Sequence, residues 1–485
     1  MGEKVADNNK VVKAGVGYII GNYLLKGLSF LTVPIFSRLM EPADYGMYNT
    51  FIAYEAILYI VIGFAIHSSY KNALYKYGTI ENGAVRGKDY DTYVSTTMVL
   101  LMVSAAVWFA LFFLFGGWLT GLMGLDQISL VLLLVYSFSG AVLACYNAYV
   151  GLKYQYKSFL TVSGINAVSN IGLSILLMFT LFPSDRYMAR MIGTTVPITL
   201  IAVYIIILFF RKSRPGNYKP FLSWGLKYST PIISHGISQV ILSQFDRIMI
   251  NRMINPESAG IYSFAYNIYA IINVTARSLD NVWNPWFYEQ MAKKRFENIR
   301  KKSSIYALLM MLVSVGVMLI SPELVRVLGD VKYWAASYSV IPIVAGGFFA
   351  FLYTIPASIE YYYEKTKFIA LGTFAAAIIN IVLNFVFIQT MGYIAAAYTT
   401  LATYFLYFLF HYIIAAKIHG SCIFSNKAMA FCSVLVLAVA GLSLLLMDLV
   451  VVRWILAVGA AVVLVVTEER TIGFSKKILK KFRRK

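Results

Sequence analysis

Long apolar stretches separated by short polar connections run along the whole chain. We count fourteen of them, each about 18–25 residues long, the length that an α-helix needs to cross a hydrocarbon core roughly 30 Å thick. They are 14–37, 49–69, 92–115, 128–150, 159–182, 188–210, 225–250, 259–285, 303–320, 336–360, 368–388, 394–416, 428–447 and 450–467. No connection approaches the roughly 50 residues that a soluble domain needs. The pattern predicts an all-α integral membrane protein with about 14 transmembrane helices, whose function lies within the helix bundle.

Composition and charge agree with this prediction. Of the 485 residues 59% are hydrophobic and only 13% are charged, whereas a soluble protein has about 25% charged residues. A net charge of +20 would suggest nucleic acid in a soluble chain, but 31 of the 42 lysines and arginines fall in the tails and even-numbered connections and only 5 in the odd-numbered ones. This positive-inside bias predicts a multi-pass membrane protein with both termini cytoplasmic. We expect no nucleic-acid partner.

An internal repeat indicates how the spans are grouped. The segment 38–57 matches 252–271 at six of twenty positions without a gap, and both segments join the first two spans of a half. A second match pairs Asn170 with Asn380 around the fifth span of each half. Six spans per copy give both copies the same orientation, as in transporters built from parallel repeats. Each copy of the 38–57 segment contains a Pro-x-x-x-Gly motif, in which we expect proline and glycine to shape a short external turn.

The repeat predicts two parallel six-helix lobes and a C-terminal hairpin. The expected divisions are a cytoplasmic N-tail 1–13, an N-lobe 14–210, a cytoplasmic linker 211–224, a C-lobe 225–416, a hairpin 417–467 and a basic cytoplasmic tail 468–485. In the first span Gly17-x-x-x-Gly21 is typical of close helix packing.

Polar side chains within the spans gather on the first two helices of each lobe. Ionisable groups at membrane depth are costly, and they usually face a cavity or a partner. The candidates for lining a cavity are Lys26, Arg277, Arg247, Asn22, Asn273, Asn284 and Tyr266, and those for ion coupling or for pairing between lobes are Glu55, Asp246, Asp280, His67 and His235. Lys26 has no acid one turn away, which favours cavity lining. Asp280 could instead pair with Arg277, and the two histidines could be hydrogen-bonded packing residues.

Motifs for enzymatic chemistry are not found in the sequence. There is no phosphate-binding loop, no zinc-ligand spacing and no nucleophile elbow, and the three cysteines suggest no disulfide framework. We therefore expect no enzyme, no cofactor and no metal.

Three segments resemble a known family: GNYLLKGLSFLTVPIFSRLMEPADYGMYN (21–49), SQFDRIMINRMINPESAGIYSFAYNI (243–268) and YYYEKTKFIALGTFAAAIINIVLNFVFI (361–388). They look like the polysaccharide or oligosaccharide repeat-unit flippases of the multidrug/oligosaccharidyl-lipid/polysaccharide exporter superfamily. The resemblance covers roughly residues 10–415. The count of fourteen spans departs from the commoner twelve of this family. In this count the chain resembles the lipid II flippases of the same superfamily.

The resemblance implies a cargo and partners. The cargo would be an undecaprenyl-diphosphate-linked oligosaccharide, moved by alternating access from the cytoplasmic to the outer leaflet of the bacterial plasma membrane. It would serve the synthesis of O-antigen, capsule or another envelope polysaccharide. The partners would be membrane lipids and the polymerase and glycosyltransferases of the pathway. The physics agrees, because a diphosphate needs embedded cations and a sugar needs aromatic and amide groups. Two alternatives stay open, a drug/cation antiporter of the same superfamily and an integral-membrane polysaccharide polymerase.

Overall fold

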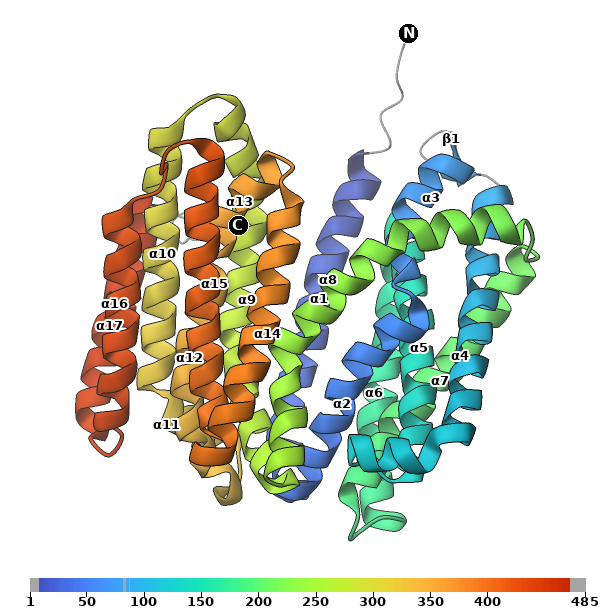
Figure 1. The fold of residues 1–485 in the computed structure, drawn as a ribbon, viewed down its shortest axis with the longest axis horizontal. Helices are drawn as coiled ribbons and strands as arrows, with labels where there is room; N and C mark the ends of the chain where they lie inside the picture. Colours follow the sequence, from blue (N-terminus) through green and yellow to red (C-terminus); the bar gives the residue numbers. More distant parts are fainter. Residues whose placement is uncertain (1–7, 82–83, 87, 472–485) are drawn as a thin grey trace, which may run out of the picture. The chain divides into compact units, whose positions relative to one another are not determined.

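The computed structural model describes residues 8–81, 84–86 and 88–471. It is helical throughout this part apart from one short hairpin, and it divides into two compact units, Met1–Arg252 and Met253–Lys485 (Figure 1). The six-helix lobes inferred from the repeat remain a prediction. The basic residues of the predicted C-terminal tail, from Lys476 onward, lie outside the described residues.

The described part of the first unit contains nine helical segments. They are α1 (Asn8–Leu39), α2 (Pro42–Gly63), η1 (Ile66–Ser69), α3 (Tyr70–Tyr77), α4 (Lys88–Met123), α5 (Gln127–Leu152), α6 (Tyr156–Thr180), α7 (Arg186–Lys212) and α8 (Tyr218–Met253). Strands β1 (Thr79–Glu81) and β2 (Ala84–Arg86) pair antiparallel between α3 and α4. Helix α5 packs against α2, α4 and α7, so its side chains form the middle of this unit.

The described part of the second unit contains ten helical segments, several of them short. They are α9 (Pro256–Ala292), α10 (Phe296–Leu319), α11 (Ser321–Leu328), η2 (Val331–Ala336), α12 (Ser337–Leu352), α13 (Thr354–Tyr362), α14 (Thr366–Met391), α15 (Ala395–His419), α16 (Asn426–Leu445) and α17 (Val450–Thr471). Helix α12 is its core, because α12 packs against α9, α10, α15 and α16. The last two helices both pack on α10.

Ten helical segments of the described part are long and apolar enough to cross a membrane. They confirm that this is an all-helical, multi-pass membrane protein. Helix α17 has a shorter apolar stretch, Val450–Val466, and α8 and α9 have 36 and 37 residues but carry many polar side chains. With these three and α1, of 32 residues, fourteen crossings remain our prediction.

The two glycines of the first span do allow close packing, as predicted. A Cβ atom built on Gly17 would lie 2.3 Å from the ring of Tyr156, and one on Gly21 would lie 1.8 Å from Leu160. Real Cβ atoms do not approach so closely, so α1 can lie against α6 at this distance only without side chains at these two positions.

The prediction for the Pro-x-x-x-Gly motif is wrong for its glycines. Pro42 and Pro256 begin α2 and α9, where a missing N–H costs nothing. Gly46 and Gly260 lie one turn later, inside these helices, and both are buried. The repeated motif therefore starts a helix and places its glycine at a buried position inside it, and no external turn depends on that glycine.

Two predicted connections contain secondary structure that the hydrophobic pattern did not reveal. Residues 70–91 hold α3 and the β1–β2 hairpin, and residues 321–335 hold α11 and η2. All are short elements that lie outside the long apolar runs, and they are ordered by packing, as α3 is against α4 and α5.

Candidate functional site

Polar and aromatic side chains follow one face of α9 in the second unit. They are Tyr262, Tyr266, Tyr269, Asn273, Arg277, Asp280 and Asn284, at steps of three and four residues. This spacing places them along a single stripe of the helix. The stripe changes from aromatic to polar and charged along the chain, so one helix presents both kinds of group that a charged glycan carrier would need.

Arg277 is the exposed cation of this stripe. Its Nε donates a 2.7 Å hydrogen bond to Oδ1 of Asn273, one turn earlier, and its side chain is exposed. A guanidinium whose Nε is bonded by a side-chain amide still has its Nη atoms for bidentate contact with a carboxylate or phosphate. Arg277 and Asn273 thus form an exposed hydrogen-bonded pair of a cation and an amide.

The aromatic part of the stripe is made by neighbouring tyrosines. The hydroxyls of Tyr262 and Tyr266 lie 3.3 Å apart, and the ring centroids of Tyr266 and Tyr269 are 5.5 Å apart. The Tyr266 and Tyr269 rings meet edge to face, and Tyr262 is fully buried. Aromatic rings that carry hydroxyl groups can pack on the apolar face of a sugar and exchange hydrogen bonds with it, which makes Tyr266 and Tyr269 the candidates in this stripe. Tyr266 is half-buried.

Asp280 binds another helix. The Oγ1 atom of Thr354, at the start of α13, donates a 2.9 Å hydrogen bond to Oδ1 of Asp280. Arg277 thus bonds Asn273 on its own helix, whereas Asp280 bonds Thr354 on α13. Asn284, one turn beyond Asp280, is exposed.

The predicted residues of α8 are more deeply buried. Asp246 is fully buried, and Arg247 is 6% exposed. Arg247 donates to the backbone oxygen of Ser243 at 3.0 Å and to Oε1 of Gln244, both within its own helix. His235 is half-buried. Arg247 is therefore less accessible to a ligand than Arg277.

The remaining predicted residues lie on the first helices of the first unit. Lys26 is exposed on α1, whereas the side chain of Asn22 lies outside the described part. Glu55 is half-buried on α2, with Oε1 so close to Gly140 of α5 that a Cβ there would be 2.9 Å away. His67 is half-buried in η1. The α9 stripe thus belongs to the second unit. The first unit contains the other predicted residues, Lys26, Glu55, His67, His235, Asp246 and Arg247.

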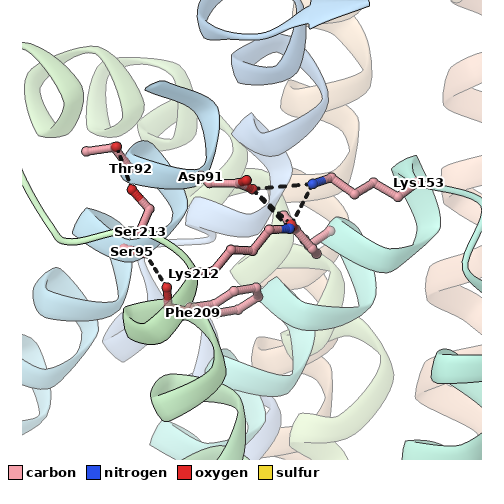
Figure 2. Close-up of polar contacts among 8 residues, drawn as sticks. Asp91, Thr92, Ser95, Lys153, Phe209, Lys212 and Ser213 are labelled. Carbon is pink, nitrogen blue, oxygen red and sulfur yellow. Dashed lines mark hydrogen bonds and ion pairs between the residues drawn. The ribbon is translucent and has the colours of Figure 1, made fainter. Parts of the chain in front are cut away.

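Sequence reasoning missed a charged cluster where α4 begins and α5 and α7 end. Figure 2 shows Lys153 and Lys212 converging on Asp91, with N–O distances of 3.3 and 3.5 Å. The hydroxyl of Tyr149 donates to Asp91 at 2.9 Å, and its ring lies 4.1 Å from the Lys153 ammonium. Burial lowers the pKa of Lys153, and the Asp91 carboxylate acts in the opposite direction.

The same region fixes the start of the segment that leads to α8. Thr92 and Ser213 share a 2.8 Å hydrogen bond between their hydroxyls, and Ser95 donates to the backbone oxygen of Phe209 at 3.0 Å (Figure 2). Thr96 bonds both the backbone oxygen and the backbone N–H of Gly216, at 2.8 and 3.0 Å. The residues after α7 are therefore held onto α4.

A second missed pair anchors α17 in the other unit. Arg453 is 1% exposed, and its two Nη atoms each lie 2.7 Å from an oxygen of Glu323 on α11, while Nη1 also donates to the backbone oxygen of Leu319. Partial burial raises the pKa of Glu323, but the hydrogen bonds from Arg453 outweigh it and hold the pKa below its usual value. Arg453 lies within the predicted span 450–467, and nothing in the sequence indicated this partner 130 residues away.

We expect Arg453→Met to lower the free energy of unfolding by about 3 kcal/mol, because it leaves the Glu323 carboxylate without its partner. Thermal unfolding in detergent would measure the loss. Since the folded pKa of Glu323 is lowered, the pair stabilises above the ordinary carboxyl pKa, and the difference should vanish as pH falls through the lowered value. Lys417→Met is the control, since Lys417 is exposed in the last turn of α15. Equal losses in both variants would contradict an anchoring role for Arg453.

Comparisons with known proteins agree with the fold and the sequence resemblance. Lsg locus putative protein 1 of Haemophilus influenzae is 23% identical over 386 residues, which cover 77% of this chain and 90% of that protein. The solved structure described as the lipid II flippase MurJ in an inward closed conformation has a TM-score of 0.69 at 15% identity and covers 94% of this chain and 99% of that one. An inward-facing multidrug resistance MATE family transporter has a TM-score of 0.60 at 12% identity and covers 81% and 96%.

Family comparisons are more specific than these distant structures, which show the fold alone. The MatE family matches residues 231–386, and the family described as polysaccharide biosynthesis protein matches residues 11–291, more than half of the chain. The chain belongs to this polysaccharide biosynthesis protein family, within the multidrug/oligosaccharidyl-lipid/polysaccharide exporter superfamily of membrane transporters.

Proposed function

We propose that the protein is a flippase that moves undecaprenyl-diphosphate-linked oligosaccharide repeat units from the cytoplasmic to the outer leaflet of the bacterial plasma membrane, for envelope polysaccharide biosynthesis. Family membership supports this proposal, and the exposed Arg277–Asn273 pair is the observation that carries it. Both termini are cytoplasmic, and transport proceeds by alternating access between the two lobes.

The chemistry of the cargo matches the groups on α9. A diphosphate needs a cation that is accessible and already oriented, and Arg277 is both. The sugar takes the tyrosine rings and the amides of Asn273 and Asn284, while the lipid tail stays in the bilayer. Lys26, exposed on α1, supplies a second cation. Arg247 has the weaker case because it is buried.

A drug/cation antiporter is the second candidate, since the fold is also similar to that of a multidrug resistance transporter. Its site should be dominated by acids and aromatics, whereas the exposed charge of the α9 stripe is an arginine. A polymerase is disfavoured because the family is one of transporters.

Ligand binding separates the two transporter candidates. We expect the purified protein to bind an undecaprenyl-diphosphate-linked sugar at least tenfold more tightly than a lipophilic cationic dye, because a cation attracts the diphosphate and repels the dye. Arg277→Ala should remove most of this preference. Tighter binding of the dye would favour the antiporter.

A further inference from the structure

A carboxyl group and an imidazole are sealed together inside the second unit. Glu360 on α13 and His411 on α15 lie 51 residues apart in sequence, yet Oε1 and Nδ1 are 2.6 Å apart and both side chains are 0% exposed. Their other polar atoms, Oε2 of Glu360 and Nε2 of His411, have no hydrogen-bond partner within the described part of the chain. The pair therefore satisfies only half of its own polar atoms.

The pair is closed to solvent and lies among aromatic rings. The ring centroids of Tyr353, Tyr407 and Phe410 lie 5.5, 4.5 and 5.2 Å from that of His411. Helix α14 approaches with Gly372, where a Cβ would lie 3.1 Å from Nε2 of His411.

Other titratable groups face the pair from each neighbouring helix. Tyr361 of α13 and Tyr407 of α15 interact electrostatically with Glu360, and Thr373 of α14 bonds the Tyr407 hydroxyl at 2.8 Å. Tyr353, between α12 and α13, interacts with Asp280 of α9. The nearest of these neighbours are phenols, which leaves Glu360 and His411 to determine the local charge.

Burial restricts the pair to one proton. With one proton between them the two groups are neutral together, as an ion pair or as two uncharged groups. With no proton or with two, the site carries a net charge at zero exposure, which costs several kcal/mol. Loss or gain of the proton therefore requires that the site open to water.

Helix α13 could open this site. It has nine residues, is separated from α12 at Tyr353, and contains Pro356, which lacks the N–H of a continuous ladder. It is tied to α9 twice, by the Thr354–Asp280 bond and by a 2.8 Å bond from Trp283 to Ser358, and to α15 by the Glu360–His411 pair. Asp280 lies one turn from Arg277, so the helix that would hold the diphosphate also holds α13.

We propose that Glu360 and His411 form a proton-binding site, which exchanges its proton when α13 moves and so couples inward proton movement to outward passage of the cargo. The coupling rests on the proposed function, whereas the proton site does not. No bond other than those of the transferred proton changes: the proton leaves water on one side, resides on the pair and returns to water on the other.

The proton site is tested without cargo. Infrared difference spectra of the protein in nanodiscs, taken across a pH step, should contain carboxyl and imidazole bands that disappear together in Glu360→Gln and in His411→Asn. His419→Asn is the matched control, because the chain has only four histidines and His419 bonds Tyr363 at an exposed position. Bands that persist in both test variants would overturn the proton site.

Coupling is tested in proteoliposomes with the potential held at zero by valinomycin and equal potassium, using a fluorescent undecaprenyl-diphosphate-linked disaccharide. A gradient of one pH unit, acid outside, should speed outward flipping by up to about tenfold for one proton. Glu360→Gln and His411→Asn should lose this response and keep flipping driven by potential, and His419→Asn should keep both.

Unchanged responses to the pH gradient in both test variants would overturn the coupling and leave the flippase assignment intact. Absence of flipping in the unmodified protein under either driving force would instead contradict the proposed function. In that case the infrared experiment, which compares the unmodified protein with the two variants and needs no cargo, still decides whether the pair binds a proton.

Discussion

Replacing Arg277 by alanine is expected to abolish surface polysaccharide while membrane insertion is retained. The substitution removes the exposed guanidinium that Asn273 orients, and losing a charge-assisted bidentate contact costs about 3 kcal/mol, more than a hundredfold in binding. Lys26→Ala should have the same effect if both cations contact the diphosphate. Polysaccharide on the cell surface, measured at matched expression, tests this.

Charge-keeping variants sharpen this test. Lys26→Arg and Arg277→Lys should retain partial function, because each keeps the charge but changes the geometry of the donors. Arg326→Ala removes another exposed arginine of the same unit, outside the α9 stripe, and should leave polysaccharide normal. Normal polysaccharide in both Lys26→Ala and Arg277→Ala would refute the assignment of the headgroup site.

The membrane potential is expected to drive much of the transport. A lipid diphosphate carries about two negative charges, and each charge moved across the membrane is worth about 2.3 kcal/mol per 100 mV, so outward flipping is favoured by about 4–5 kcal/mol per 100 mV. The cations of the site stay with the protein, so they lower the barrier without cancelling this net movement, provided that they return after each cycle.

Proteoliposomes with a potassium–valinomycin potential and no proton or sodium gradient measure this contribution. An inside-negative potential should accelerate outward flipping relative to zero potential. If it does not, obligatory ion antiport through Glu55, Asp246, Asp280 or a histidine becomes the better explanation. Such a result would leave the identity of the cargo unchanged.

Hydrophobic periodicity located the long helices well but not the short ones. The predicted span 188–210 corresponds to α7 (Arg186–Lys212), and 368–388 to α14 (Thr366–Met391), because twenty apolar residues in a row have few alternatives to a spanning helix. The break at Tyr353 that separates α12 from α13 was not foreseen, since the apolar run continues through it.

Pairing between helices explains what the sequence could not reveal about the site. The stripe on α9 was predictable because its residues share one helix at steps of three and four. Glu360 and His411 come from different helices, and Arg453 meets Glu323 across 130 residues. Such partners follow from the packing of helices, to which the pattern within a single helix gives no access.

Flipping of a fluorescent undecaprenyl-diphosphate-linked oligosaccharide by the purified protein tests the central claim most directly. With proteoliposomes held at an inside-negative potential, a membrane-impermeant quencher added outside should reach the tagged lipid as it leaves the inner leaflet. The account predicts rapid loss of the protected fluorescence with the unmodified protein and a rate close to that of protein-free vesicles with Arg277→Ala. Equal rates for the unmodified protein and protein-free vesicles would contradict it.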